Sequence, residues 1–400
     1  MKATFKPCRL EGTIDAPPSK SMAHRYLLSA ALSGESCQLS GVDFSEDILA
    51  TIDCLRALGA FITTDGDRVE IKSGNFMNVS APTLECRESG STLRFFIPLA
   101  LCLGKPVILR GSSRLLQRPL DVYEELCKAH GFEFCKTSDR ITLCGNLGSG
   151  NYKIRGDISS QFITGLILAL VYLGEDSSIE IIPPFESRSY VDLTLSALAS
   201  FGADAKFASE YKIEIKKSEM HAFSGKIEGD YSNAAFLDAF NRIGSRVKVL
   251  NLNEDSLQGD RVYAEYFDAI DRGAPTLDIS DCPDLGPVLF ALAALKNGAT
   301  FTGTDRLKAK ESDRGQAMHE ELSKLGGGLI FGDNSITVPK QELKNTGVVL
   351  DGHNDHRIVM ALSIILSTVG GEIEGIEAVK KSYPRFFDEI RDLGAEVEIK

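Results

Sequence analysis

The chain has 400 residues, 43% of them hydrophobic, so we expect about two domains with large buried cores. The formal net charge of −12 argues against nucleic acid or an anionic membrane as a partner, because both are bound through clustered positive charge. No apolar stretch reaches the roughly 18 residues of a membrane helix, and no leader-like segment opens the chain. We therefore expect a cytoplasmic protein.

Nine scattered cysteines include no CxxC pair, which is typical of reduced thiols in a cytosolic protein. A disulfide framework or a zinc ribbon is not expected. His353 and His356 stand three residues apart, but a zinc site needs a third and a fourth ligand at recognisable spacing. The sequence therefore predicts no metal site.

In chain order, six apolar helical runs form the first marker of an internal repeat. Each run begins with small or capping residues and ends about 14 residues later at a glycine. The predicted starts are Lys20, Gly90, Ser160, Tyr231, Asp284 and Asp355, and the closing residues are Gly34, Gly104, Gly174, Gly244, Gly298 and Gly370. The competing interpretation is coincidence among common glycines.

The second marker is a glycine that ends another helix and leads into alternating, strand-like residues. These glycines are Gly59, Gly131, Gly202, Gly273, Gly326 and Gly394. Glycine is favoured just past a helix end because it adopts the left-handed conformation without a Cβ clash. Each repeat is predicted as strand, helix, strand, helix and a closing strand pair. Most spacings are 70 to 72 residues, but Gly273 and Gly326 lie 53 apart, so the fourth repeat should lack its last hairpin.

The first helix of each repeat is unusually apolar, as in FITGLILALVYLG, and should be buried on most sides. Polar residues gather at the helix starts, where unpaired N–H groups and partial positive charge favour anions. Arginine and lysine, which bind phosphate and carboxylate, lie at or beside these starts. They are Lys20, Arg25, Arg94, Arg118, Arg188, Lys310, Arg314, Arg357 and Lys381. The pattern predicts a cleft for small anions; solvated surface charges are the alternative.

Three helix starts in the first half carry candidate ligand groups. In SKSMAHR, Lys20 and Ser21 precede Arg25 by about one turn, and a plain serine cap is the alternative. In ESGSTLR, Gly90 permits close backbone approach. ISSQF offers two hydroxyls and an amide, although Ser159 as a mere cap explains that segment equally well.

Acid and base candidates come from the second half of the chain. Asp284 begins an apolar helix whose dipole would keep the carboxylate ionised, as a proton acceptor requires, and an ordinary N-cap aspartate is the alternative. The segment LKAKESDR sets Lys310, Glu311, Asp313 and Arg314 together before a helix. A plain charged loop competes with a functional role there.

The motifs SKSMAHR, ESGSTLR, RPL at Arg118, SSQF, SRSYVD, PDLGPV, KAKESDR, NDHR and KSYP occur in this order over nearly the whole chain. As an ordered set they resemble the 5-enolpyruvylshikimate-3-phosphate synthase family. The resemblance implies a two-domain inside-out α/β barrel, in which each domain has three βαβαββ repeats with buried parallel helices. Residues 13–220 would bind mainly shikimate 3-phosphate. Residues 1–12 and 221–400 would carry the acid and base groups and several phosphoenolpyruvate ligands.

The same resemblance implies the ligand sets. Shikimate 3-phosphate would be bound by Lys20, Ser21, Arg25, Ser159, Ser160, Gln161, Ser187, Tyr190, Asp284 and Lys310. Phosphoenolpyruvate would be bound by Lys20, Gly90, Arg94, Arg118, Gln161, Arg314, Arg357 and Lys381. Asp284 resembles the proton acceptor for the 5-hydroxyl and Glu311 the group that transfers a proton at the enol carbon, while Lys20 would lie between the substrates as a third catalytic residue.

The implied reaction transfers the enolpyruvyl group of phosphoenolpyruvate to shikimate 3-phosphate and releases phosphate, a step of chorismate and aromatic amino acid biosynthesis. General acid and base groups suffice, so no metal or cofactor is expected. We expect a monomer whose only partners are the two substrates, and whose domains close on binding to exclude water.

Two rival functions remain. The sister enzyme that acts on UDP-N-acetylglucosamine normally has a reactive cysteine in a loop that corresponds to GSSRLLQRPL, and this stretch has none. A noncatalytic anion-binding protein with the same repeats would not need Asp284, Glu311 and Lys20, all of which are present. Phosphate release with each acceptor discriminates these possibilities.

Overall fold

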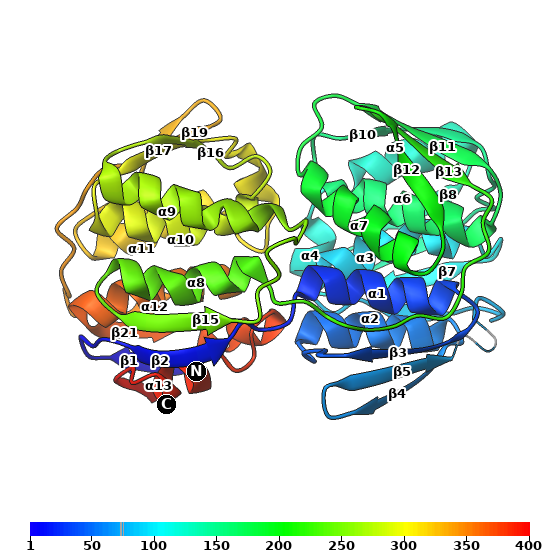
Figure 1. The fold of residues 1–400 in the computed structure, drawn as a ribbon. Helices are drawn as coiled ribbons and strands as arrows, with labels where there is room; N and C mark the ends of the chain where they lie inside the picture. The colour runs from blue at the N-terminus through cyan, green and yellow to red at the C-terminus, as the bar shows by residue number, and fades with distance from the viewer. Residues whose placement is uncertain (73, 75) are drawn as a thin grey trace. The chain divides into compact units, whose positions relative to one another are not determined.

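The computed structural model describes residues 1–72, 74 and 76–400, which form two compact units (Figure 1). The first unit comprises residues 1–17 and 229–400, and the second comprises residues 18–228. The chain thus crosses after residues 17 and 228, later than the boundaries of 12 and 220 placed from the sequence. The boundaries shift because the segments just before the two crossings form strands that pair within the unit they leave. Strand β2 (Glu11–Asp15) pairs in parallel with β15 (Arg246–Leu250), and β14 (Ser224–Lys226) pairs in parallel with β3 (Ser36–Ser40).

The second unit contains three four-stranded sheets with a common plan. Their strand orders are β14-β3-β5-β4, β6-β7-β9-β8 and β10-β11-β13-β12, so the first two strands are parallel and the closing hairpin is antiparallel. The other strands are β4 (Phe61–Asp65), β5 (Arg68–Lys72), β6 (Thr83–Glu85), β7 (Val107–Arg110), β8 (Glu133–Lys136), β9 (Arg140–Cys144), β10 (Asn151–Arg155), β11 (Ser177–Ile182), β12 (Asp204–Ser209) and β13 (Lys212–Lys216). The helices are α1 (Lys20–Leu32), α2 (Glu46–Ala57), α3 (Gly90–Leu101), α4 (Ser113–Gln117), α5 (Asp121–His130), α6 (Ser160–Leu173) and α7 (Arg188–Ser200).

The first unit follows the same plan in two of its sheets, β16-β17-β19-β18 and β20-β21-β1-β22. Its strands are β1 (Lys2–Phe5), β16 (Thr276–Asp278), β17 (Ala299–Thr302), β18 (Ile330–Gly332), β19 (Ser335–Val338), β20 (Leu350–Asp351), β21 (Gly371–Glu374) and β22 (Val397–Ile399). Its helices are α8 (Tyr231–Arg242), α9 (Tyr263–Arg272), α10 (Gly286–Leu295), α11 (Arg314–Lys324), α12 (His356–Val369) and α13 (Phe386–Asp392), with short turns η1 (Gly259–Val262), η2 (Pro283–Leu285), η3 (Asp305–Ala309) and η4 (Ile376–Lys381).

The third sheet of the first unit has only two strands, β15 and β2. No hairpin follows α9, which confirms the predicted loss in the fourth repeat. One related prediction is wrong: Gly273 does not adopt the left-handed conformation of the other repeat glycines, because its φ of 170° is extended. The chain there runs on to β16 instead of turning back into a hairpin.

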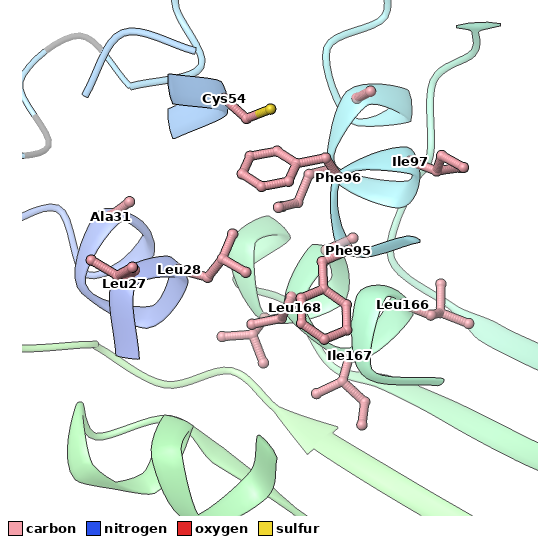
Figure 2. Packing of buried hydrophobic residues seen from close by; sticks show 14 of the residues in the cluster. Leu27, Leu28, Ala31, Cys54, Phe95, Phe96, Ile97, Leu166, Ile167 and Leu168 are labelled. Carbon is pink, nitrogen blue, oxygen red and sulfur yellow. The ribbon is translucent and has the colours of Figure 1, made fainter. Parts of the chain in front are cut away.

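The apolar first helices of the repeats form the interior of each unit, as predicted. In α10, every residue from Gly286 to Ala294 is buried, and α12 is buried from His356 to Ser367. In the second unit, apolar side chains of α1, α3 and α6, together with Cys54 of α2, pack into one core (Figure 2). Because these helices are apolar on nearly all sides, they lie inside and the sheets lie at the periphery of each unit (Figure 1). The architecture is the expected inside-out α/β barrel.

Five of the six predicted starts fall at or next to the first residue of a helix, namely Lys20, Gly90, Ser160, Tyr231 and Asp355. All six closing glycines have positive φ, between 64° and 103°. At the remaining start, Asp284 lies in the turn η2, and α10 begins two residues later. Within the described residues, no helix has the length and apolar character needed to cross a membrane.

Candidate active site

Asp284 lies at the centre of a cluster of charges in the first unit. One of its oxygens, Oδ1, accepts a hydrogen bond from Arg314 Nη1 at 2.6 Å and lies 3.0 Å from Lys310 Nζ. The other, Oδ2, accepts from Arg357 Nη2 at 3.2 Å. Asp284 is the N-cap residue of neither η2, which begins after Cys282, nor α10, which begins after Leu285, so the N-cap interpretation is wrong. Its carboxylate is therefore held by three cations from two other segments of the chain, LKAKESDR and NDHR.

Arg314 joins this cluster to two further carboxylates. Its Nη2 donates to Glu311 Oε2 at 2.8 Å, and its Nε donates to Asp355 Oδ2 at 3.0 Å. Asp355 is fully buried, accepts from Ser312 Oγ at 3.0 Å, and caps α12. Glu311 and Asp284 keep 18% and 19% of their side-chain surface exposed. The buried contacts therefore orient Arg314, while these two carboxylates remain accessible to a ligand.

The ionisation of this cluster is set by its partners. Burial alone would raise the pKa of Asp284, but the charges of Arg357, Lys310 and Arg314 hold it well below the usual range. From the sequence, the dipole of α10 is expected to keep Asp284 ionised; in the structure, the charges of these three cations have this effect. Burial, with repulsion from Arg314 and Arg306, lowers the pKa of Lys310 to about 8, against the opposing attraction of Asp284.

Two further residues flank the start of α12. Lys381 Nζ donates to the carbonyl oxygen of Asn354 at 2.6 Å. This contact places Lys381, which is predicted to bind phosphoenolpyruvate, next to the residue that precedes Asp355. His353 belongs to a separate network: its Nε2 lies 2.7 Å from Glu321 Oε1, and Lys324 Nζ lies 2.8 Å from Glu321 Oε2. Because Glu321 already binds a histidine and a lysine, this group is an internal ion-pair network.

In the second unit, α1 carries Lys20 and Arg25 at its start, as predicted, and each of the two side chains has its own partners within the unit. Lys20 Nζ donates to Asp47 Oδ2 at 2.8 Å. Arg25 is buried; it donates to Thr194 Oγ1 at 2.9 Å and to the carbonyl oxygens of Ser21 and Tyr190 at 2.7 and 2.8 Å. The segment does have a serine cap, because Ser19 caps α1 by accepting from Met22 N, but the exposed charges of that alternative are not found at Arg25. Burial without a carboxylate partner lowers the pKa of Arg25 to about 10.

Helices α3 and α6 meet through Arg94 and Gln161. Arg94 Nη1 donates to Gln161 Oε1 at 2.7 Å, and Gln161 Nε2 donates to Ser91 Oγ at 2.9 Å. Arg118 lies against the start of α3, because a Cβ placed on Gly90 would stand 2.6 Å from Arg118 Nη1. The predicted close approach to Gly90 is thus made by an arginine of the same unit.

Three serines predicted to bind shikimate 3-phosphate, Ser159, Ser160 and Ser187, stand at helix starts. Ser159 caps α6 by accepting from Gln161 N at 3.3 Å, which confirms its role as a cap and leaves ligand contact untested. Ser160 is buried in the first turn of α6. Ser187 is buried before α7 with a left-handed φ of 54°. Helix α7 begins at the next residue, Arg188, and carries Tyr190 in its first turn.

Two residues of this arrangement were missed from the sequence, Asp47 and Asp355. Asp47 stands in the first turn of α2 in an ordinary acidic context, so nothing local marked it as the partner of Lys20. Asp355 stands inside NDHR and was read only as a helix start. Its buried hydrogen bond to Arg314 spans 41 residues of sequence.

Clustered cations around two accessible carboxylates, together with helix starts, define an α/β enzyme for small, multiply charged anions. The chain belongs to the EPSP synthase (3-phosphoshikimate 1-carboxyvinyltransferase) family, whose model matches residues 5–390. It is therefore an enzyme of the transferase class.

Individual relatives agree with this assignment. The 3-phosphoshikimate 1-carboxyvinyltransferase of Clostridium kluyveri is 40% identical, and the alignment covers 99% of this chain and 98% of the relative. That of Clostridioides difficile is 37% identical over 98% and 97%. An EPSP synthase structure from Acinetobacter baumannii matches with a TM-score of 0.78 at 21% identity, covering 100% of this chain and 99% of that one. The enolpyruvyl transferase NikO from Streptomyces tendae matches with a TM-score of 0.75 at 14% identity, over 99% and 98%. The structural matches show the fold.

Proposed function

We propose that this enzyme transfers the enolpyruvyl group of phosphoenolpyruvate to the 5-hydroxyl of shikimate 3-phosphate, releasing phosphate and forming 5-enolpyruvylshikimate 3-phosphate. The observation that carries the proposal is Asp284, a partly exposed carboxylate bound by three cations, in a chain of the EPSP synthase family. The product is a precursor of chorismate and of the aromatic amino acids.

In the addition step, the oxygen of the 5-hydroxyl forms a bond to C2 of phosphoenolpyruvate, and Asp284 accepts the proton of that hydroxyl. Glu311, in its protonated form, delivers a proton to C3 and becomes a carboxylate, so the CH2 group of the double bond becomes a methyl group and a tetrahedral ketal phosphate forms. In the elimination step, the Glu311 carboxylate takes a proton back from C3, the C2–C3 double bond returns, and the C2–O bond to phosphate breaks so that inorganic phosphate leaves. Lys20, the third proposed catalytic residue, lies between the substrates and offsets the charge that develops on the leaving phosphate.

The cations that depress the pKa of Asp284 also explain how this carboxylate becomes a base. In the free enzyme, Arg357, Lys310 and Arg314 hold the pKa so low that Asp284 is a weak acceptor. Bound phosphate and carboxylate groups share the same cations and add negative charge nearby, which raises the pKa. The proposed substrates therefore activate the base by their own charge.

We propose that phosphoenolpyruvate is bound by Arg314, Arg357 and Lys381 of the first unit, and by Gly90, Arg118, Arg94 and Gln161 of the second. Shikimate 3-phosphate is bound by Ser21, Arg25, Ser159, Ser160, Gln161, Ser187 and Tyr190, with Lys310 and Asp284. Arginine suits both substrates because its fork binds carboxylate and phosphate oxygens in pairs. None of these steps requires a metal or cofactor, and we propose that the enzyme works as a cytoplasmic monomer.

The direct test is phosphate release by the purified enzyme with phosphoenolpyruvate and one of two acceptors. Release with shikimate 3-phosphate and none with UDP-N-acetylglucosamine supports the proposal. Release only with the nucleotide sugar assigns the sister activity, and release with neither contradicts both. A preparation of Asp284→Asn made in parallel controls for contaminating phosphatase, which this variant would leave unchanged.

A further inference from the structure

Four buried polar side chains form a continuous chain across three helices of the second unit. His24 of α1 places Nδ1 2.8 Å from Thr51 Oγ1 of α2, and Thr51 Oγ1 lies 2.7 Å from Thr92 Oγ1 of α3. Thr92 Oγ1 in turn lies 2.7 Å from Ser89 Oγ. Each of the four residues is at most 1% exposed. None of them belongs to the ligand sets proposed above.

The available acceptors determine which atom donates in each of these hydrogen bonds. Thr92 has one hydroxyl hydrogen, and its acceptors are Ser89 Oγ at 2.7 Å and the carbonyl oxygen of Asp47 at 3.4 Å. Either acceptor directs that hydrogen away from Thr51, so the Thr51 hydroxyl donates to Thr92 and must accept from His24. His24 therefore carries its hydrogen on Nδ1.

The other ring nitrogen, His24 Nε2, is buried and has no hydrogen-bond partner among the described residues. Burial, reinforced by the charges of Lys20 and Arg25, lowers the pKa of His24 well below its ordinary value. The ring is neutral, with its bare Nε2 in apolar surroundings that include the Phe95 ring, whose centroid lies 6.2 Å from that of His24. A neutral histidine places no further positive charge beside Lys20 and Arg25.

We propose that His24 is a positioning residue that, through Thr51 and Thr92, fixes the start of α3 relative to the starts of α1 and α2. The chain ends on Ser89, which caps α3 by accepting from Thr92 N at 3.2 Å and directly precedes Gly90. Lys20 and Asp47 already join α1 to α2 at 2.8 Å. The consequence rests on the proposed function, because Gly90 is there assigned to phosphoenolpyruvate.

Kinetics of matched variants test the role. Thr51→Val removes the central hydroxyl at nearly constant shape, and His24→Leu removes the donor. We expect each to raise KM for phosphoenolpyruvate about tenfold, the usual scale for one lost hydrogen bond, with little change in kcat or in KM for shikimate 3-phosphate. Thr51→Ser and His24→Asn keep the donor and acceptor groups and should restore wild-type values.

Ser29→Ala is the control, because Ser29 lies on α1, is fully buried, and its hydroxyl has no hydrogen-bond partner among the described residues. It should behave as wild type. Equal increases in KM for both substrates, an unchanged KM in Thr51→Val, or the same defect in Ser29→Ala would overturn the positioning role.

A measurement without substrate separates this inference from the proposed function. In nitrogen-15 spectra of histidine-labelled wild-type enzyme at pH 7, with His24 assigned from the signal that is lost in His24→Asn, we expect a neutral ring protonated at Nδ1. In Thr51→Val the hydrogen should no longer be fixed on Nδ1. A ring protonated at Nε2 or at both nitrogens in the wild type would overturn the inference even if the enzyme is fully active. The expected spectrum would support the chain of hydrogen bonds even if phosphate release failed.

Discussion

Arg314 in the first unit and Arg25 in the second are both buried, but the partners of Arg314 are negatively charged and those of Arg25 are neutral. Arg314 in the first unit is 1% exposed and contacts the carboxylates of Asp284, Glu311 and Asp355. Arg25 in the second unit is 3% exposed and contacts a hydroxyl and two carbonyl oxygens. Burial disfavours the charge of both, yet the carboxylates raise the pKa of Arg314, whereas the pKa of Arg25 falls to about 10. The charge of the partner, more than burial, decides the outcome.

This difference suggests a division of labour between the units. In the first unit, the positive charge is balanced internally, and the balancing carboxylates include the proposed acid and base. Around Arg25 in the second unit, hydroxyls and carbonyls orient the guanidinium without cancelling its charge, so a bound anion would complete the electrostatic balance. Substitutions within the carboxylate–cation cluster of the first unit should therefore have their largest effects on chemistry and stability, whereas substitutions around Arg25 and Gly90 in the second unit should mainly affect ligand affinity.

The largest effect is expected from Asp284→Asn, which keeps the shape of the side chain and removes its basicity. Turnover should fall by about 10²- to 10⁴-fold, the usual contribution of a general base, with little loss of substrate binding. Phosphate release under saturating substrate measures turnover, and calorimetry of substrate binding provides the comparison. Near-normal turnover would contradict the role of Asp284 as proton acceptor.

Stability should respond next, because Arg314→Met leaves the buried carboxylate of Asp355 without its cation. We expect a loss of about 3–5 kcal/mol in the free energy of unfolding, as is usual when one partner of a buried ion pair is removed. Arg25→Met removes hydrogen bonds to neutral groups and the stacking of the guanidinium on the Phe95 and Tyr190 rings, but strands no buried carboxylate, and should cost about 1–3 kcal/mol. Urea denaturation of both variants compares the units directly. Equal losses would show that the carboxylate partners do not distinguish them.

Gly90→Ala tests ligand affinity in the second unit. The added Cβ would stand 2.6 Å from Arg118 Nη1, so the guanidinium must move. Overpacking of this kind costs about 1–3 kcal/mol, and we expect the affinity for phosphoenolpyruvate to fall roughly tenfold while turnover at saturation changes little. Gly148→Ala, in the same unit, with open space around its Cβ position and a φ outside the left-handed region as at Gly90, is the control for the added methyl group itself. A similar loss in both variants would exclude a specific effect on Arg118.

Local patterns in the sequence predicted much of the fold. The repeat helices, their closing glycines and the missing hairpin of the fourth repeat depend on residues close together in the chain, and the structure confirms them. The prediction for Gly273 was wrong because its conformation depends on the path of the chain toward β16. The crossings were placed too early because β2 and β14 are assigned by pairing with distant strands, which no local pattern in these short segments reveals.

In the candidate site, too, local motifs predicted some features, whereas others depend on contacts between distant parts of the sequence. Sequence motifs identified the cations and Asp284, since these stand at helix starts or in charged segments. The motifs did not reveal which partner each cation has, because Lys20 and Asp47 are 27 residues apart and Arg25 and Thr194 are 169 apart. The cause of the low pKa of Asp284 was misassigned for that reason. Partner identity, which distinguishes the two units, is a property of tertiary packing.

The smallest expected effect is a pH dependence of shikimate 3-phosphate binding that arises from Lys310. Its pKa is lowered to about 8, and an anionic ligand favours the protonated amine, so affinity is highest below pH 8 and falls as the pH rises through this value. The substrate phosphate has its second pKa near 6, so its charge is nearly constant above pH 7. Affinity should drop about twofold between pH 7 and 8, and approach a tenfold loss per unit above that.

Lys310→Arg keeps the positive charge over this whole range, so calorimetric titration of the variant from pH 7 to 9 should show a much flatter dependence. Lys6→Arg, at an exposed position of the first unit, should retain the wild-type slope. If the slope of Lys310→Arg matched that of the wild type, another group would be titrating. A flat wild-type profile would mean that Lys310 remains charged, and that Asp284 compensates burial in the first unit more completely than the structure indicates.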